Sequence, residues 1–241
     1  MPRLARISWL AAMLVLCAAR PAHATWSIVA VDPATGEVGG ASATCTPWAQ
    51  AIFEVVPGKG VIVTQAASNR WARYRGKVLL IEGQGPAAII ADITDRDFDP
   101  RRAIQQHGVA ALGFRPDAAG YTGAETGRAA GDLQAAGVSV QGNILAGRGV
   151  LTAALRAFEA ARADPSLTLA DRLLLALQAG ADLGGDRRCG AQTATSAYLV
   201  VARPDDPPLA PSVRLAAPVQ EIGGRNAVEL LREMYERTVG R

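Results

Sequence analysis

Histidine and cysteine are scarce in this sequence of 241 residues. It contains two histidines and three cysteines, and they form no cluster with the spacing of a metal site. No glycine-rich phosphate-binding motif is present either. The sequence therefore predicts neither a metal nor an organic cofactor.

An excess of charge of one sign is also lacking once the N-terminal segment is set aside. The net charge of +3 comes from Arg3, Arg6 and Arg20, because residues 1–24 contain no acidic residue. The remaining chain has 22 of the 25 basic residues and all 22 acidic residues. This balance gives no reason to expect nucleic acid or an anionic membrane as a partner.

The only extended apolar run near the N-terminus is typical of a secretory signal peptide. Arg3 and Arg6 precede an uncharged stretch over residues 7–19, and Ala22-His23-Ala24 is a small-x-small cleavage site. The stretch is shorter than the about 20 residues that span a bilayer. We therefore expect cleavage before Thr25 and a protein in the periplasm or outside the cell, without a membrane anchor.

Two alternatives concern this segment. A retained anchor would leave it uncleaved, and a lipoprotein would be processed at Cys17. The bulky Leu16 before Cys17 fits lipoprotein processing poorly. The expected organisation is thus a signal peptide over 1–24 and a single domain over 25–241.

Cys45 and Cys189 remain after cleavage, an even pair in an oxidising compartment. They form either a disulfide that closes a long loop or two buried free thiols. A catalytic cysteine is not expected, because the only histidine of the mature chain, His107, lies in a segment without another chemical signal.

The pattern of apolar residues and turn signals predicts separate runs of strands and helices. The expected strands cover 26–31, 37–44, 55–56, 61–66, 107–114, 118–122, 137–145, 195–202 and 212–216, and the expected helices lie within 75–90 and over 151–161, 169–183 and 227–238. Such segregated runs favour an α+β fold with helices packed on sheet faces. The basic and aromatic stretch 69–75 is interpreted as a solvated loop, in preference to a site for a substrate anion.

Thr25 becomes chemically interesting if it is the new N-terminus. A threonine hydroxyl is a weak nucleophile that needs a base. An α-amine has a pKa of about 7.7–8.0, so a useful fraction is neutral near pH 7 and can act as that base. An expected hairpin begins one residue later and would hold Thr25 on a rigid strand.

Several spaced motifs resemble the bacterial domain-of-unknown-function 1028 family. They are the stretch 25–39 (TWSIVAVDPATGEVG), Val63-Thr64-Gln65-Ala66 with Asn69, Thr122-Gly123, the stretch 139–147 (SVQGNILAG) and the stretch 184–188 (GGDRR). They cover nearly the whole mature chain in the same order. The family is usually grouped with the N-terminal nucleophile hydrolases, so the resemblance implies a four-layer αββα sandwich.

The resemblance also implies roles for individual residues. Thr25 would be the nucleophile, and the Asn143 side chain would stabilise an oxyanion together with the backbone N–H of Gly142 or Asn143. Gln65 and Asn69 would form a polar wall of the substrate site. Asp186 and Arg187 would form an ion pair that orients the amine or binds a substrate carboxylate. The alternatives are a plain Gly-Asn turn at 142–143 and a loop salt bridge at 186–187.

The function expected from the sequence is therefore an exported hydrolase that cleaves an amide bond in a small molecule or peptide. The alternative is a binding or cell-wall-associated protein on the same scaffold without turnover. Association into a homo-oligomer is also expected, since hydrolases of this type often associate.

Overall fold

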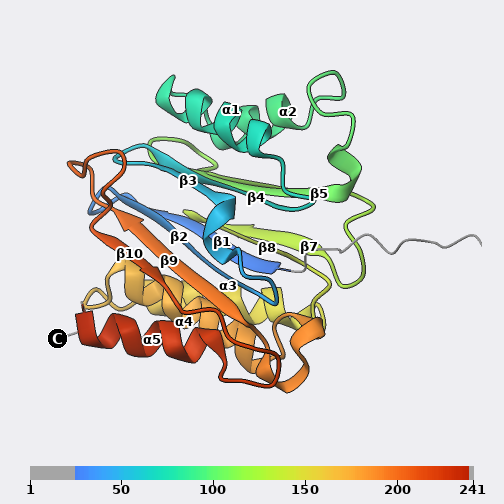
Figure 1. Ribbon diagram of the computed structural model, residues 1–241. Helices are drawn as coiled ribbons and strands as arrows, with labels where there is room; N and C mark the ends of the chain where they lie inside the picture. The colour runs from blue at the N-terminus through green and yellow to red at the C-terminus, as the bar shows by residue number, and fades with distance from the viewer. Residues whose placement is uncertain (1–24, 239–241) are drawn as a thin grey trace, which may run out of the picture.

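Two antiparallel sheets pack face to face, with helices on both outer faces (Figure 1). The computed structural model describes residues 25–238. In the six-stranded sheet the order is β10 (Val213–Ala216), β9 (Ser196–Ala202), β2 (Glu37–Thr44), β1 (Thr25–Asp32), β8 (Val138–Asn143) and β7 (Gly131–Ala135). In the four-stranded sheet it is β3 (Phe53–Val56), β4 (Gly60–Ala66), β5 (Gln105–Ala111) and β6 (Ala118–Thr122).

The helices complete four layers. They are α1 (Arg70–Ile81) and α2 (Pro86–Ile93) on the four-stranded sheet, and α3 (Gly149–Arg162), α4 (Leu169–Asp182) and α5 (Ala227–Thr238) on the six-stranded sheet, as Figure 1 shows. Short 3₁₀ helices are η1 (Ala49–Ile52), η2 (Arg102–Ile104) and η3 (Arg187–Gln192). The predicted α+β class and the αββα order of layers are both confirmed.

The predicted signal peptide lies outside the described residues. Within residues 25–238, no helix is both long and apolar enough to cross a membrane.

The central strand β1 separates two kinds of interior by the alternation of its side chains. Trp26 and Ile28 belong to the large apolar core under α3, α4 and α5. Val29 and Val31 belong to a smaller apolar cluster between the two sheets. Because side chains of a strand alternate between its faces, Thr25 and Ser27 share the intersheet face with Val29. The chain thereby directs Thr25 toward the second sheet.

The space between the sheets is apolar at one end and polar at the other. Valines of β1 and β4 fill the end near the turn after β1. At the end where β1 begins, buried amide and hydroxyl side chains replace them, among them Gln65, Gln106 and Gln141, each at most 1% exposed. This polar end contains three of the residues predicted to form the site: Thr25, Gln65 and Asn143.

Helix α1 corrects the prediction of a solvated loop over residues 69–75. Asn69 accepts hydrogen bonds from the backbone N–H groups of Trp71 and Ala72 and so caps a helix that begins at Arg70. The two following arginines are engaged: Arg75 pairs with Asp92 at 2.8 Å, and Arg73 reaches the hydroxyl of Thr64. The local cap and these partners stabilise a helix where the polar composition favoured a loop.

Other boundaries differ modestly from the predictions. Strand β7 was not predicted, because Gly131–Ala135 is short and half-exposed. Strand β5 covers Gln105–Ala111, whereas the prediction was 107–114. Gln105 and Gln106, which the predicted strand left out, are both buried in β5. Helix α5 has the predicted bounds, and Thr168 forms the N-cap of α4 within a capping box.

His107 is completely buried on β5 and stacks on Tyr121 at a centroid distance of 5.9 Å. Neither ring nitrogen has a hydrogen-bond partner among the described residues. Burial lowers the pKa of His107 from 6.5 to about 4, while the nearby charge of Asp99 opposes this shift. The folded protein therefore keeps this imidazole neutral at pH values where the unfolded chain protonates it.

This difference predicts that stability falls as the pH is lowered. The unfolded state binds the proton first, so the free energy of unfolding should decrease by about 3 kcal/mol between pH 6.5 and pH 4. Urea unfolding of the wild type and of a His107→Gln variant should be measured across this range. The variant lacks the His107 contribution, so its free energy of unfolding should decrease by about 3 kcal/mol less than that of the wild type. Equal slopes for the two proteins would contradict the prediction.

Candidate active site

Thr25 lies at the polar end of the intersheet space. Its partners across the strands are Thr44 on β2 and Asn143 on β8. Thr25 is 5% exposed and lines a cavity of about 170 Å³ together with Trp48 and Ile52. The hydroxyl-bearing residue thus sits on a rigid central strand and in the wall of a small cavity.

Gln106 connects the two sheets through its side-chain amide. Its Nε2 donates to the carbonyl oxygens of Gly142 at 2.8 Å and Gly131 at 3.1 Å. Its Oε1 accepts from Asn143 Nδ2 at 2.8 Å and from Gln65 Nε2 at 3.1 Å. Backbone carbonyls can only accept, so they fix the orientation of the Gln106 amide and, through it, those of the other two amides.

The network continues to the backbone of Thr25. Gln65 Nε2 also donates to the Thr25 carbonyl oxygen at 3.3 Å, and Gln65 Oε1 accepts from Ser27 Oγ at 2.7 Å. Gln141 Nε2 donates to the same Ser27 hydroxyl at 2.7 Å. Gly108 makes room for Gln141, because a Cβ there would lie 2.1 Å from Gln141 Oε1. The start of β1 is therefore held by side chains from both sheets.

Asn143 has unused hydrogen-bonding capacity. Its Nδ2 carries two N–H groups, of which one is donated to Gln106. Its Oδ1 is buried without a partner among the described residues, although the side chain is only 1% exposed. Asn143 also lines a second, larger cavity of about 870 Å³. An unpartnered buried acceptor is unfavourable, so a ligand with an N–H group would be stabilised here.

Gly142 differs in placement from Asn143. It pairs with Trp26 on one side and with Gly131 on the other, so its backbone N–H points into the sheet. A Cβ at Gly142 would lie 2.8 Å from Leu145 Cδ1. Close packing against this leucine accounts for the glycine, and the oxyanion contact predicted for the N–H of Gly142 has no free donor at this position.

Gln65 and Asn69 lie in the walls of different cavities. Gln65 lines the small cavity with Thr25, and Asn69 lines the larger one. Asn69 Nδ2 donates to Asp99 Oδ2 at 2.6 Å, while its Oδ1 caps α1. Both residues are thus near the site, but the polar atoms of each already have partners within the protein.

The ion pair predicted between Asp186 and Arg187 is formed with Arg188 instead. Asp186 is fully buried and accepts from the Arg188 guanidinium at 2.7 Å, whereas Arg187 forms no ion pair within residues 25–238. Asp186 also caps the 3₁₀ helix η3 by accepting from the Arg188 backbone N–H at 3.0 Å. This cap turns Arg187 outward and brings the Arg188 side chain back, to 3.5 Å from Thr44 Oγ1 beside Thr25.

Cys45 and Cys189 form a disulfide, with their Cα atoms 5.8 Å apart. Of the two alternatives left open by the sequence, the paired one is therefore found. The Cys45 backbone N–H also donates to Asp186 Oδ2 at 2.8 Å. The bond ties the end of β2, next to Thr25, to the segment that carries Asp186 and Arg188.

Unusual backbone conformations gather around the same end of the sheets. Ala66, Ile144 and Thr193 have positive φ angles of 62°, 51° and 65°. Ala66 lines both cavities, and Ile144 follows Asn143 directly. Residues without glycine's freedom adopt this region only where the surroundings enforce it, and such strain is often found at functional sites.

Sequence reasoning missed four residues that the structure brings to this site: Gln105, Gln106, Arg188 and Trp48. A signal for the first two was available, since two adjacent glutamines directly precede an apolar strand pattern. The Arg188 guanidinium reaches the Thr44 hydroxyl at 3.5 Å, although the two residues are 144 positions apart in sequence. No local pattern reveals that proximity.

The fold and site define a four-layer αββα protein with a threonine, flanked by buried amides, at the start of a central strand. The profile of the Family of unknown function (DUF1028) matches residues 25–221. The chain belongs to this family, as its motifs suggested.

A crystal structure of protein SPO2555 from Silicibacter pomeroyi, of the same family, is similar to this chain. The two are 30% identical with a TM-score of 0.74, over 89% of this chain and 85% of the other. A structure of Thiobacillus denitrificans BPH in complex with epoxomicin aligns over 76% of this chain and all of the other, with 15% identity and a TM-score of 0.41. That likeness is too low to inform on activity. No functionally curated protein matches the chain.

The amide network predicts a large cost for replacing Gln106. A Gln106→Leu variant leaves two buried carbonyls and two amide donors without their partner, so its free energy of unfolding should fall by about 3 kcal/mol or more. Gln134 is exposed on β7, and Gln134→Leu should change stability by less than about 1 kcal/mol. Denaturant unfolding of both variants checks this, and similar losses would refute it.

The disulfide predicts the thiol content of the chain from Thr25 onward. Titration of this denatured, unreduced chain should find no free thiol, since Cys45 and Cys189 are paired. Replacing both by serine should lower stability by about 2–5 kcal/mol, because the cross-link restricts the unfolded chain. Two titratable thiols, or an unchanged denaturation midpoint, would contradict the assignment.

Proposed function

We propose that this protein is an exported hydrolase of the N-terminal nucleophile type, in which Thr25 attacks an amide carbonyl. The observation that carries the proposal is the position of Thr25, at the first residue of β1, in a cavity wall, with Asn143 directly across the strands. The match to the family profile also begins at Thr25. The substrate would be an amide of a small molecule or peptide.

Removal of residues 1–24 would create the base as well as the nucleophile. The freed α-amine of Thr25 would accept the proton of the Thr25 hydroxyl as its oxygen bonds to the carbonyl carbon. The proton then passes to the leaving amine as the amide C–N bond breaks. Water hydrolyses the resulting ester, which releases the acid and restores the hydroxyl.

Asn143 would stabilise the negative charge that develops on the carbonyl oxygen. Its second Nδ2 N–H is not needed by Gln106, and Asn143 is the partner of Thr25 across the ladder. A buried, preorganised donor of this kind is effective because it needs no reorganisation during the reaction. Gln106 would therefore act on catalysis indirectly, by holding the Asn143 amide.

The pair of Asp186 and Arg188 supports the start of β1 from the other side. The disulfide and the Cys45 N–H fix Asp186, and Asp186 in turn fixes the Arg188 guanidinium near Thr44. A positive charge near the Thr25 amine would favour its neutral form, which is the form that acts as a base. A disulfide at this point also suits an exported protein.

The test is acylation of the exported protein. Sequencing should find Thr25 as the mature N-terminus, and a hydroxyl-reactive acylating probe should form an ester on it. Thr25→Ala should reduce labelling and hydrolysis of an amide panel by at least about 10³-fold, as expected for loss of a nucleophile. An added residue before Thr25 should abolish both, because the amine would then be a peptide nitrogen.

Thr35→Ala is the matched control, since Thr35 is an exposed threonine at the other end of the same hairpin. This variant should label and hydrolyse as the wild type does. Equal labelling and turnover by the wild type and Thr25→Ala would overturn the proposal and leave a binding function on this scaffold.

A further inference from the structure

Two adjoining cavities meet at the candidate active site. The small cavity contains Thr25 and the larger one contains Asn143, while Ala66 and Ser68 line both. Because Thr25 and Asn143 are partners across the strands, an amide bond at Thr25 would have one cavity on its acyl side and the other on its amine side. The linings of the two cavities therefore describe the two halves of the substrate.

The small cavity is suited to a short apolar group. Trp48, Ala51 and Ile52 line it opposite Thr25. Its volume of about 170 Å³ is a fifth of that of its neighbour. No charged residue lines it, so the acyl side of the substrate should be small and uncharged.

The wall of the larger cavity contains two buried acceptors that the protein does not use. Asn143 Oδ1 and Gln105 Oε1 have no partner among the described residues, and their side chains are 1% and 2% exposed. The orientation of Asn143 follows from the fixed amide of Gln106, so its oxygen faces away from the network. Two buried, unpartnered acceptors call for a ligand with at least two N–H donors.

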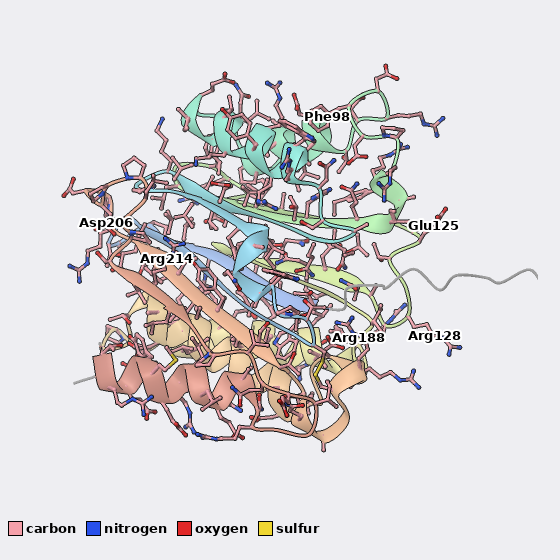
Figure 2. The ribbon with its side chains drawn as sticks, in the orientation of Figure 1. Phe98, Glu125, Arg128, Arg188, Asp206 and Arg214 are labelled. Carbon is pink, nitrogen blue, oxygen red and sulfur yellow. A yellow bond between two sulfur atoms is a disulfide. The ribbon has the colours of Figure 1, made fainter. Side chains whose placement is uncertain are left out.

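Charged side chains surround the mouth of the same cavity. Arg70 and Arg101 are exposed there with Glu125, and Figure 2 shows Glu125 projecting at this edge. The Arg70 guanidinium lies over the Trp71 ring at 4.9 Å. The Arg101 guanidinium has no ion pair or hydrogen bond among residues 25–238, because Asp99 accepts only from the Arg101 backbone and from Asn69. Arg101 is thus available to bind an anion.

We propose that the larger cavity binds the amine side of a short peptide, which donates successive backbone N–H groups to Asn143 and Gln105 and places its terminal carboxylate against Arg101. This deepens the proposed function and depends on it for the identity of the scissile bond. Hydrolysis would add water across the amide, giving an acylated residue with a new carboxylate and a released short peptide with a new amine. The substrate class is a short peptide with a small apolar residue on the acyl side.

The test measures binding without turnover, in the mature Thr25→Ala protein. The probe is N-acetyl-alanyl-glycyl-glycine, compared by calorimetry with the same peptide ending in a carboxamide. The free acid should bind about tenfold more tightly, as expected for a charge-assisted contact. Arg101→Gln should remove that preference. Arg128→Gln, at an exposed arginine outside this cavity that Figure 2 labels, should retain it.

A second comparison tests the N–H donors. Replacing the last glycine of the probe by N-methylglycine removes one N–H and should weaken binding about tenfold. The Gln105→Met variant lacks the acceptor, which is the buried, unpartnered Oε1. In this variant the glycine probe and the N-methylglycine probe should bind equally well. Folding of this variant is verified by its denaturation midpoint, which should not fall.

The outcomes separate this inference from the proposed function. Equal affinity for acid and carboxamide, no binding of either, or a preference that survives Arg101→Gln would overturn the inference. If the predicted preferences are found but the wild type neither hydrolyses the probe nor becomes acylated, the proposed hydrolase function fails and the peptide-binding cavity stands.

Discussion

Gln106 makes the contact between the two sheets on which the candidate site depends. Its amide donates to two backbone carbonyls of the six-stranded sheet and accepts from Asn143 and Gln65. The carbonyls permit only one orientation of that amide, so all the amides linked to it are oriented as well. A polar group buried between two sheets is tolerated because nearly every atom has a partner.

Two buried acceptors near this contact lack a hydrogen-bond partner. Asn143 Oδ1 and Gln105 Oε1 are buried without partners, and both lie in the wall of one cavity, next to Thr25. Elsewhere between the sheets, valines pack without polar groups. The protein thus places these two acceptors, together with the positive φ angles of Ala66 and Ile144, near the end where β1 begins. This placement supports the proposed function, because acyl transfer requires preorganised polar groups near the nucleophile.

Much of the architecture could be predicted from local patterns. The apolar alternation of Thr25–Asp32, the turn after it and the helical spacing of Leu169–Asp182 rest on interactions within a few residues, and these elements are found near their expected bounds. The exceptions have a common reason. Gln105 and Gln106 suggest solvent in the sequence, and only tertiary packing buries them. The six-stranded sheet covers Gln106, while Gln105 shares the other face of β5 with Val109.

The site residues also differ in whether their roles could be predicted from local sequence. The choice of Asp186 as one partner of an ion pair was possible from sequence, but Arg188 rather than Arg187 completes it, because the capped turn at the start of η3 brings the Arg188 guanidinium back to Asp186. Gly142 was expected to offer an N–H donor, but it lies inside the sheet, with Trp26 beside it on one strand and Gly131 on the other. Contacts that depend on strand register and helix caps are not encoded in residue type alone.

By itself the sequence determined which residues alternate toward the second sheet and where strands and helices follow one another, since these depend on side-chain period and local turns. Its motifs also indicated the family. The tertiary structure alone decided that Gln106 orients Asn143, that Cys45 and Cys189 are paired, and that two cavities meet beside Thr25. Those outcomes depend on residues far apart in the chain being brought together, which burial and backbone hydrogen bonding accomplish only when both sheets are assembled.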